Sequence, residues 1–325
     1  MLSRSWLDRD NAVALAVTAV ALPSLALSGA SGPARWPGVG VCLVAAVALL
    51  AFLVPAIQER VGREVLRRPS LAWSVPLGFA LYGAGATLLV GSGDLIAVAA
   101  WPACVVGAFL AVAPGRDEGI PAGRLLAAGL SLAILAGVWD RALQIRVPGD
   151  ARLGLAYLCC IGLALFLFSI AHPRRPIDVR LGLCARDLLI ALVAVVVLAA
   201  AAVPVGLWLG LLRWEPRWLG AGYGLARLFG LVVFVGLPEE LLFRGVFQNA
   251  LARLTTPRAG WVLASVIFGL THLAKHFPPP NWPYAALATA AGLAYGWVYL
   301  RTGRVAAAAL AHGLVNWIWG TWLGA

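Results

Sequence analysis

The sequence predicts an all-α fold, a polytopic bundle of about eleven transmembrane helices, and three observations point to it. Apolar residues make up 62% of the 325 residues and charged residues only 12%, whereas soluble domains average about 45–50% and about 25%. The mean hydropathy is +0.88. Apolar stretches of about 20 residues, long enough to cross the hydrocarbon core of a bilayer as a helix, recur along the chain. A soluble fold of this length could not bury so much apolar surface.

Eleven such stretches follow one another along the chain and are the candidate spans. The first has a basic front and ends in small residues, like a signal peptide, but Asp8, Asp10 and its near-full length favour a retained first span. No strand-like alternation competes over comparable lengths. The set lies near residues 11–30, 38–57, 72–91, 95–114, 123–139, 153–171, 188–212, 227–252, 260–275, 283–300 and 305–324.

The formal net charge of +11 is carried by basic clusters between the apolar stretches, as in 59–68 and 174–186. Such clusters set membrane topology. With the N-terminus in the cytoplasm, the cytoplasmic loops collect about twice as many basic residues as the outer ones, so this orientation is predicted. No basic helix with interleaved aromatic residues stands clear of an apolar span, which excludes nucleic acid as a partner. The lipid bilayer is the expected partner.

Two parts of the chain differ in their chemistry. Most of the first seven spans contain mainly Ala, Leu, Val and Gly, with few groups able to do acid–base chemistry. The basic stretch from His172 to Asp187 is the best candidate boundary between this part and a polar-rich second part. The predicted domains are therefore residues 1–186, an N-terminal transmembrane bundle of unknown role, and residues 187–325, which carry the candidate active site in the last four spans.

Glu239, Glu240 and Arg244 interrupt an otherwise apolar predicted helix. Each ionised side chain at the bilayer centre costs on the order of 2.5–3.5 kcal/mol, so such groups are retained where they pair with each other or serve a function. Glu240 and Arg244 are four residues apart, share a helix face and are expected to form an ion pair. Glu239 lies about 100° around the helix from Glu240 and therefore needs a different partner.

The following spans supply candidate partners. His272 is predicted to lie well inside the span near 260–275, and His312 and Asn316 share a face of the last span. A carboxylate, two histidines and an amide on separate helices suit hydrolysis, with an acid–base pair to activate water and donors for the developing oxyanion. Taken singly, each of these residues except Glu239 is more often a packed, hydrogen-bonded group. Taken together they favour a functional site, because all the strongly polar groups deep in the C-terminal spans belong to this one set. The same cluster could also form the relay of an ion- or proton-coupled membrane transporter.

The three motifs together carry a resemblance. They are EExxxR from Glu239 to Arg244, FxxxH from Phe268 to His272 and HxxxN from His312 to Asn316. In this order, each on its own predicted span, they resemble the signature of the CPBP family of intramembrane proteases, which includes type II CAAX prenyl endopeptidases and bacteriocin-processing homologues. The resemblance covers roughly the last 100 residues and does not extend to the first seven spans.

The resemblance implies a role for each motif residue. Glu239 would activate the attacking water with His272 as its partner, and His312 and Asn316 would stabilise the oxyanion. Glu240 and Arg244 would hold the first motif in shape. The implied activity is that of a membrane-embedded endopeptidase.

The resemblance also bears on cofactors, substrate and location. The family is often called metalloprotease, and two histidines with carboxylates could bind zinc. The HExxH spacing of many zinc enzymes is absent, and a metal-free glutamate mechanism, which we favour slightly, is equally compatible with the residues. The expected substrate is a protein or peptide, such as a prenylated CAAX tail or a secreted peptide that is matured. The expected location is a prokaryotic plasma membrane, with the site below its cytoplasmic face.

Overall fold

The structure is a computed structural model that divides into two compact units, Met1–Gly182 and Leu183–Ala325. Each unit is described by itself, and the predicted functional domains at 1–186 and 187–325 stay a prediction. The residues that the structure describes are 12, 54–90, 95–112, 123–124, 126–129, 144–146, 152–154, 162–164, 166–167, 181–217, 220–273, 275 and 280–324.

The described part of the first unit is a short helical assembly. Helices α4 and α5 pack against each other, and the Trp101 indole donates a hydrogen bond of 2.9 Å to the Phe79 carbonyl. Helix α3 is charged rather than apolar and carries exposed ion pairs such as Arg67–Glu64 at 3.1 Å. The elements are α3 (Pro55–Arg67), η2 (Pro69–Trp73), α4 (Ser74–Val90), α5 (Leu95–Val112), β1 (Gln144–Arg146) and β2 (Arg152–Gly154).

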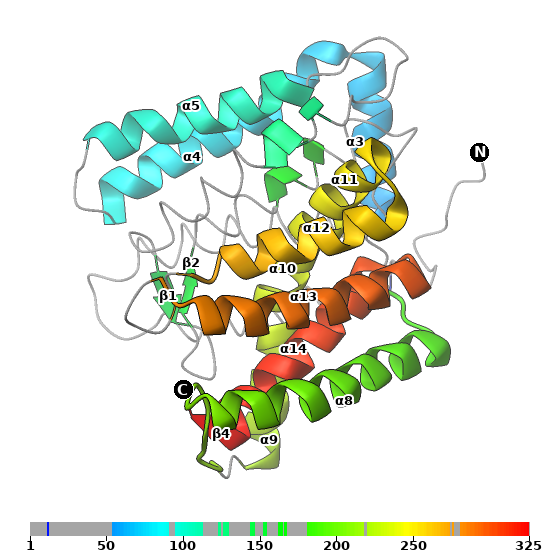
Figure 1. Ribbon diagram of the computed structural model, residues 1–325. Helices are drawn as coiled ribbons and strands as arrows, with labels where there is room; N and C mark the ends of the chain where they lie inside the picture. The colour runs from blue at the N-terminus through cyan, green and yellow to red at the C-terminus, as the bar shows by residue number, and fades with distance from the viewer. Residues whose placement is uncertain are drawn as a thin grey trace. The chain divides into compact units, whose positions relative to one another are not determined.

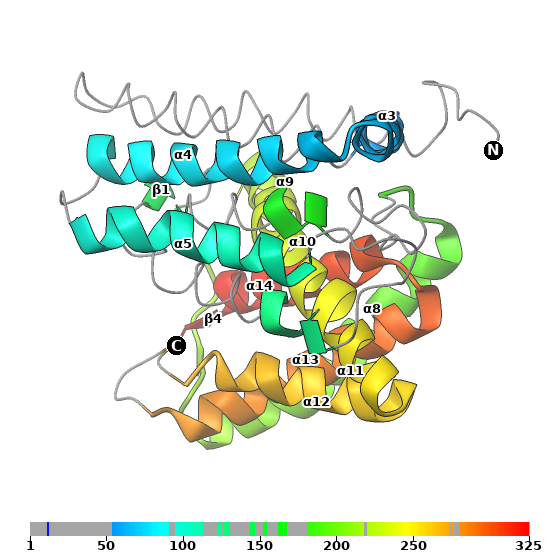
Figure 2. The ribbon, with the colours of Figure 1, turned by 90° about the horizontal axis from the view of Figure 1, so that it is seen from above.

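The second unit is built almost entirely of helices. Helix α13 packs against α12, α8 and α14, and α14 also packs against α9 and α10 (Figures 1 and 2). A short antiparallel pairing of β3 with β4 joins the segment after α8 to the end of α14. The elements are α8 (Ala185–Trp208), β3 (Arg213–Trp214), α9 (Ala221–Leu231), η4 (Val232–Gly236), α10 (Leu237–Glu240), η5 (Leu241–Gln248), α11 (Asn249–Leu254), α12 (Pro257–Leu270), α13 (Trp282–Thr302), α14 (Val305–Trp322) and β4 (Leu323–Gly324).

Local sequence signals explain where these helices begin and end. Thr256 caps α12 by accepting a hydrogen bond of 3.1 Å from the Ala259 amide, and the Asn281 side chain caps α13 in the same way at 3.0 Å. Each of these helices has a proline in its first turn, where the missing N–H costs nothing. Gly303 ends α13 with a φ of +66°, a conformation that glycine adopts without strain.

The observed helices test the predicted spans in part. The predicted spans near 72–91, 95–114, 188–212, 283–300 and 305–324 coincide with α4, α5, α8, α13 and α14 to within a few residues. Those near 11–30, 38–57, 123–139 and 153–171 lie wholly or mostly outside the described residues. Among the described residues, α8 is the helix long and apolar enough to cross a membrane by length and composition. The count of about eleven spans therefore stays a prediction.

The predicted position of His272 is wrong, and the helix that carries the glutamates departs from regular α-helical geometry. Helix α12 ends at Leu270, so His272 lies in the turn that follows the helix and not inside it. Gly236 and Pro238 do not break the helix that carries Glu239 and Glu240. Instead the chain stays helical from Ala221 to Leu254 and changes to the wider π-helical hydrogen bonding in η4 and η5, on either side of α10. A π turn accommodates Pro238, which has no N–H to donate and crowds the preceding turn.

Gly236 allows α14 to approach the helix that carries the glutamates. A Cβ atom on Gly236 would lie 2.6 Å from the Ala309 carbonyl oxygen, which is rigid backbone. We therefore expect Gly236→Ala to push α14 away and to lower the free energy of unfolding by about 1–3 kcal/mol. Gly222→Ala, in the same continuous helix with nothing within 4 Å of its Cβ position, is the matched control. Equal stability of the two variants in denaturant titrations would contradict this packing.

Candidate active site

Glu239 and Glu240 lie in α10, the single α-helical turn between the π-helical segments η4 and η5. Single π turns inside helices are rare and occur frequently at functional sites. The Glu240 side chain is completely buried, whereas the Glu239 side chain is 16% exposed. The two adjacent carboxylates therefore meet different surroundings, as their predicted separation around the helix requires.

Arg244 pairs with Glu240 as predicted from their spacing. Its Nε atom lies 2.9 Å from Glu240 Oε2, and both side chains are completely buried. The same guanidinium group donates a hydrogen bond of 3.0 Å from Nη2 to the Gly292 carbonyl of α13. It also lies 5.2 Å from the centre of the Phe268 ring, within the range of a cation–π contact. Arg244 thus connects η5 to α13 and neutralises the charge of Glu240.

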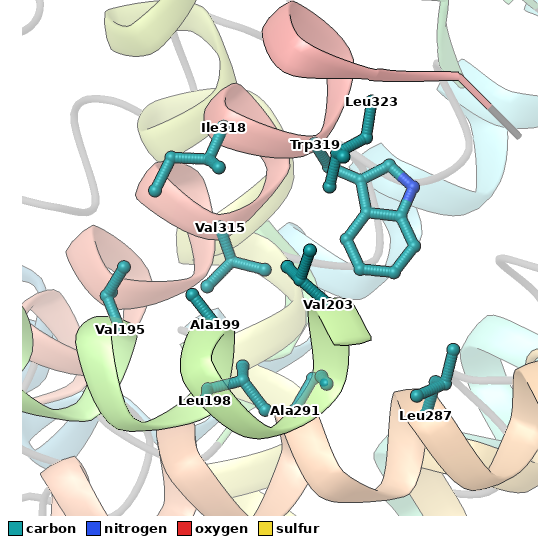
Figure 3. A pocket seen from close by; sticks show the side chains of 11 residues that line it. Val195, Leu198, Ala199, Val203, Leu287, Ala291, Val315, Ile318, Trp319 and Leu323 are labelled. Carbon is teal, nitrogen blue, oxygen red and sulfur yellow. The ribbon is translucent and has the colours of Figure 1, made fainter. Parts of the chain in front are cut away.

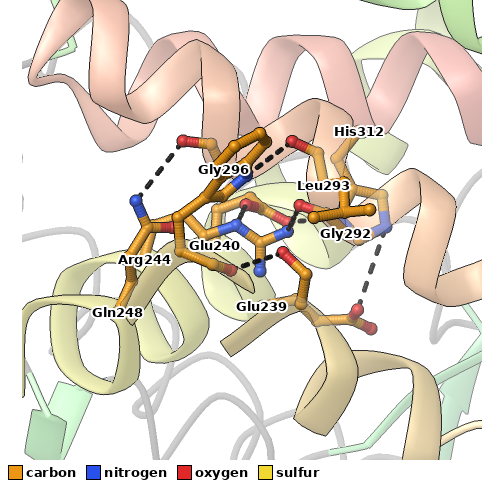
Figure 4. Close-up of polar contacts among 10 residues, drawn as sticks. Glu239, Glu240, Arg244, Gln248, Gly292, Leu293, Gly296 and His312 are labelled. Carbon is orange, nitrogen blue, oxygen red and sulfur yellow. Dashed lines mark hydrogen bonds and ion pairs between the residues drawn. The ribbon is translucent and has the colours of Figure 1, made fainter. Parts of the chain in front are cut away.

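The sequence did not indicate that Glu240 also binds His312. Glu240 Oε1 lies 2.9 Å from His312 Nδ1, so one carboxylate contacts Arg244 and His312 through its two oxygens (Figure 4). The other ring nitrogen of His312, Nε2, lies 3.8 Å from Glu239 Oε2. That distance is too long for a direct hydrogen bond, but one water molecule bonded to both atoms would fit it. His312 therefore lies between the two glutamates.

Aromatic side chains surround His312. The Tyr295 ring stacks on the His312 ring with centroids 4.6 Å apart and an interplanar angle of 13°. The Phe268 ring meets it edge-on at 5.8 Å and 88°. Phe268 also lies 4.7 Å from the His272 ring, so the phenylalanine of the FxxxH motif contacts both histidines. The stacked Tyr295 ring and the perpendicular Phe268 ring together restrict the position of the His312 ring.

The structure brings His272 to the same place through a different set of bonds. Its Nδ1 atom donates a hydrogen bond of 2.9 Å to the Phe268 carbonyl oxygen, so Nε2 is the ring nitrogen left for other groups. His272 is within electrostatic range of both Glu239 and His312. The Tyr284 ring lies 6.0 Å from the His272 ring, and this tyrosine also interacts electrostatically with Glu239. The histidine nearest to Glu239 by direct ion-pair geometry is nevertheless His312.

Asn316 is the predicted site residue with the fewest contacts. It lies one turn after His312 on α14 and is partly buried. No hydrogen bond joins its side chain to Glu239, Glu240 or either histidine in the described part of the chain. The structure thus gathers Glu239, Glu240, Arg244 and His312 through direct contacts and His272 through shared neighbours. Asn316 lies one turn after His312 on α14.

Whether zinc binds at this site stays a prediction. Structural and catalytic zinc sites take three or four protein ligands, and the described residues contain no group of three or more His, Cys, Asp and Glu side chains placed to hold a metal ion. His312 Nδ1 is bound to Glu240 and His272 Nδ1 to the Phe268 carbonyl, which leaves Nε2 of each histidine for any further ligand.

An apolar cavity of about 30 Å³ lies between α8, α13 and α14 (Figure 3). Its walls come from side chains such as Val195, Leu198, Leu287, Val315 and Trp319. None of its lining residues is charged, and it contains none of the six predicted site residues. The cavity therefore has no group that could transfer a proton or bind an oxyanion, and the candidate active site remains the cluster around His312.

Comparison with known protein families provides evidence that is independent of this geometry. Residues 221–318 match the family model described as type II CAAX prenyl endopeptidase Rce1-like. The match includes all six predicted site residues and leaves residues 1–220 outside it. No curated protein and no solved structure matched the chain. Residues 221–318 are therefore similar to the Rce1-like type II CAAX prenyl endopeptidases, a family of membrane proteases.

Proposed function

We propose that the chain hydrolyses a peptide bond of a lipidated protein or peptide near the cytoplasmic membrane face, with Glu239 as the base that activates water. The observation that carries this proposal is the position of His312 between the two glutamates, 2.9 Å from Glu240 and 3.8 Å from Glu239. Glu240 is neutralised by Arg244, so Glu239 is the carboxylate left to accept a proton from water.

Glu239 and His272 would carry out the proton transfers of the reaction. Glu239 is the more exposed of the two glutamates, which gives water access to it. His272 has Nδ1 committed to the Phe268 carbonyl, so its Nε2 can accept or return a proton at the opposite side of the ring. A base that takes the proton of water and an acid that returns it to the leaving amine complete hydrolysis of a peptide bond.

His312 and Asn316 would stabilise the oxyanion that forms on the scissile carbonyl. Because His312 Nδ1 binds Glu240, the ring presents only Nε2 to the reacting groups. Nε2 donates a hydrogen bond when both ring nitrogens carry protons, and the Glu240 carboxylate would then pair the charge of the ring. The Asn316 amide, one turn further along α14, supplies N–H donors of its own. Removal of one such donor typically costs about 10²–10³-fold in rate.

The family description supports the proposed substrate. In a CAAX tail the lipid is attached to a cysteine three residues before the C-terminus, so both the lipid and the peptide have to reach a site among helices. A substrate anchored in the bilayer would arrive from the lipid rather than from solution. The lipid bilayer is therefore both the environment of the enzyme and the medium that delivers the substrate.

A cleavage assay tests this function. The purified chain in liposomes is expected to cleave a farnesylated peptide that ends in a CAAX sequence, and His272→Ala is expected to lose this activity because it removes one of the two proton-transfer groups. Mass spectrometry identifies the bond that breaks, and the unprenylated peptide shows whether the lipid is required. A pH-sensitive dye inside the same liposomes measures proton flux. Flux that depends on Glu239 in the absence of cleavage would replace the protease assignment with a transporter.

A further inference from the structure

Helix α13 contributes no residue to the three sequence motifs, yet it lies directly against the site. Arg244 donates to the Gly292 carbonyl at 3.0 Å, Trp261 donates to the Leu293 carbonyl at 2.9 Å and Gln248 donates to the Gly296 carbonyl at 3.4 Å. These three carbonyls lie within five residues of one another on α13 (Figure 4). Donors from η5 and α12 thereby fix the backbone of α13 in this segment.

Tyr295 lies within this fixed segment and is 2% exposed. Its ring is parallel to the His312 ring within 13° at a centroid distance of 4.6 Å, and such stacked aromatic pairs contribute beyond the apolar area that they bury. Arg244 lies 5.7 Å from the centre of the Tyr295 ring. The arginine that holds Glu240 is therefore also in contact with the side chain that covers His312.

We infer that Tyr295 is a positioning residue for His312, a role that rests on the proposed hydrolytic function. Glu240 fixes the His312 ring in its own plane through Nδ1, but a single hydrogen bond allows the ring to tilt about that bond. The stacked Tyr295 ring prevents this tilt and keeps Nε2 directed towards Glu239. Arg244 links these two contacts, because it binds both Glu240, which holds Nδ1, and the backbone of α13, which carries Tyr295.

This role requires an aromatic ring at position 295 and does not require its hydroxyl group. Tyr295→Phe keeps the stack, so its kcat is expected to stay within about threefold of the unmodified chain. Tyr295→Leu keeps an apolar side chain but loses the stack, and its kcat is expected to fall about tenfold with KM unchanged, in line with the strength of stacked aromatic pairs. Tyr223→Leu, at a tyrosine of α9 that is 44% exposed, is the matched control and should change neither constant.

A second measurement separates failure of this inference from failure of the proposed function. The chain has four histidines, so NMR of histidine-labelled protein can follow the His312 ring without any substrate, with His312→Ala to assign its signals. The ring current of a stacked Tyr295 or Phe shifts the His312 ring protons upfield. This shift should persist in Tyr295→Phe and Tyr223→Leu and disappear in Tyr295→Leu.

Each outcome decides the inference. An upfield shift that survives in Tyr295→Leu overturns it, because the ring then is not held by Tyr295. A kcat of Tyr295→Phe as low as that of Tyr295→Leu also overturns it, because the hydroxyl and not the ring would then be needed. If neither the unmodified chain nor any variant cleaves the peptide, the proposed function fails. The upfield shift of the His312 ring protons then still tests whether Tyr295 stacks on His312.

Discussion

Glu239→Gln is expected to lower kcat for peptide cleavage by about 10²–10⁴-fold, the usual contribution of a positioned general base. The amide has the size of the carboxylate but cannot accept the proton of the attacking water. The role of base is assigned to Glu239 because the carboxylate of its neighbour Glu240 already contacts Arg244 and His312. Steady-state kinetics with the farnesylated peptide measure the effect. KM should change little, since Glu239 acts on the water and not on substrate binding.

The control for this variant is the same substitution at a glutamate outside the site. Glu215 lies in the same unit, with a side chain 49% exposed and an ion pair of 3.7 Å to Arg217. Glu215→Gln should cleave the peptide at the normal rate, and both variants should melt within a few degrees of the unmodified chain. Normal turnover by Glu239→Gln would show that another group activates water and would remove the mechanism proposed above.

The sequence predicted much of the second unit because membrane spans are governed by length and apolar content. The helices α8, α13 and α14 lie within a few residues of their predicted ranges. The pairing of Glu240 with Arg244 was also predictable, since residues four apart on a helix lie on one face. Helical periodicity, however, describes contacts within one helix. It could not indicate that Glu240 binds His312, 72 residues away along the chain.

The features that sequence reasoning missed depend on how helices pack. The π-helical segments on either side of Glu239 and Glu240 have no simple sequence pattern, although Pro238 indicates that ordinary α-helical hydrogen bonding is interrupted there. Tyr295 was overlooked because a tyrosine in an apolar helix is usually a packing residue. Only the geometry of α13 against α14 shows that its ring covers His312. The position of His272 in a turn was missed because the apolar stretch continues past Leu270.

Arg244→Met is expected to lower the free energy of unfolding by about 3–5 kcal/mol, the typical cost of leaving one member of a buried ion pair without its partner. Both side chains of the Arg244–Glu240 pair are completely buried. The substitution would leave the Glu240 charge with His312 alone and would remove the donor to the Gly292 carbonyl. Denaturant titration in detergent micelles measures the loss. Arg217→Met, which breaks the exposed pair with Glu215 in the same unit, should cost at most about 1 kcal/mol.

A double variant separates the two consequences of this pair. Combining Arg244→Met with Glu240→Leu removes both buried charges, and replacement of a buried ion pair by apolar side chains of similar size is often neutral for stability. Most of the lost stability should therefore return. Activity should not return, because Glu240 also holds His312 through Nδ1 at 2.9 Å. If the double variant recovered both stability and cleavage, Glu240 and Arg244 would serve only to balance each other's charge, and His312 would not depend on them for its position.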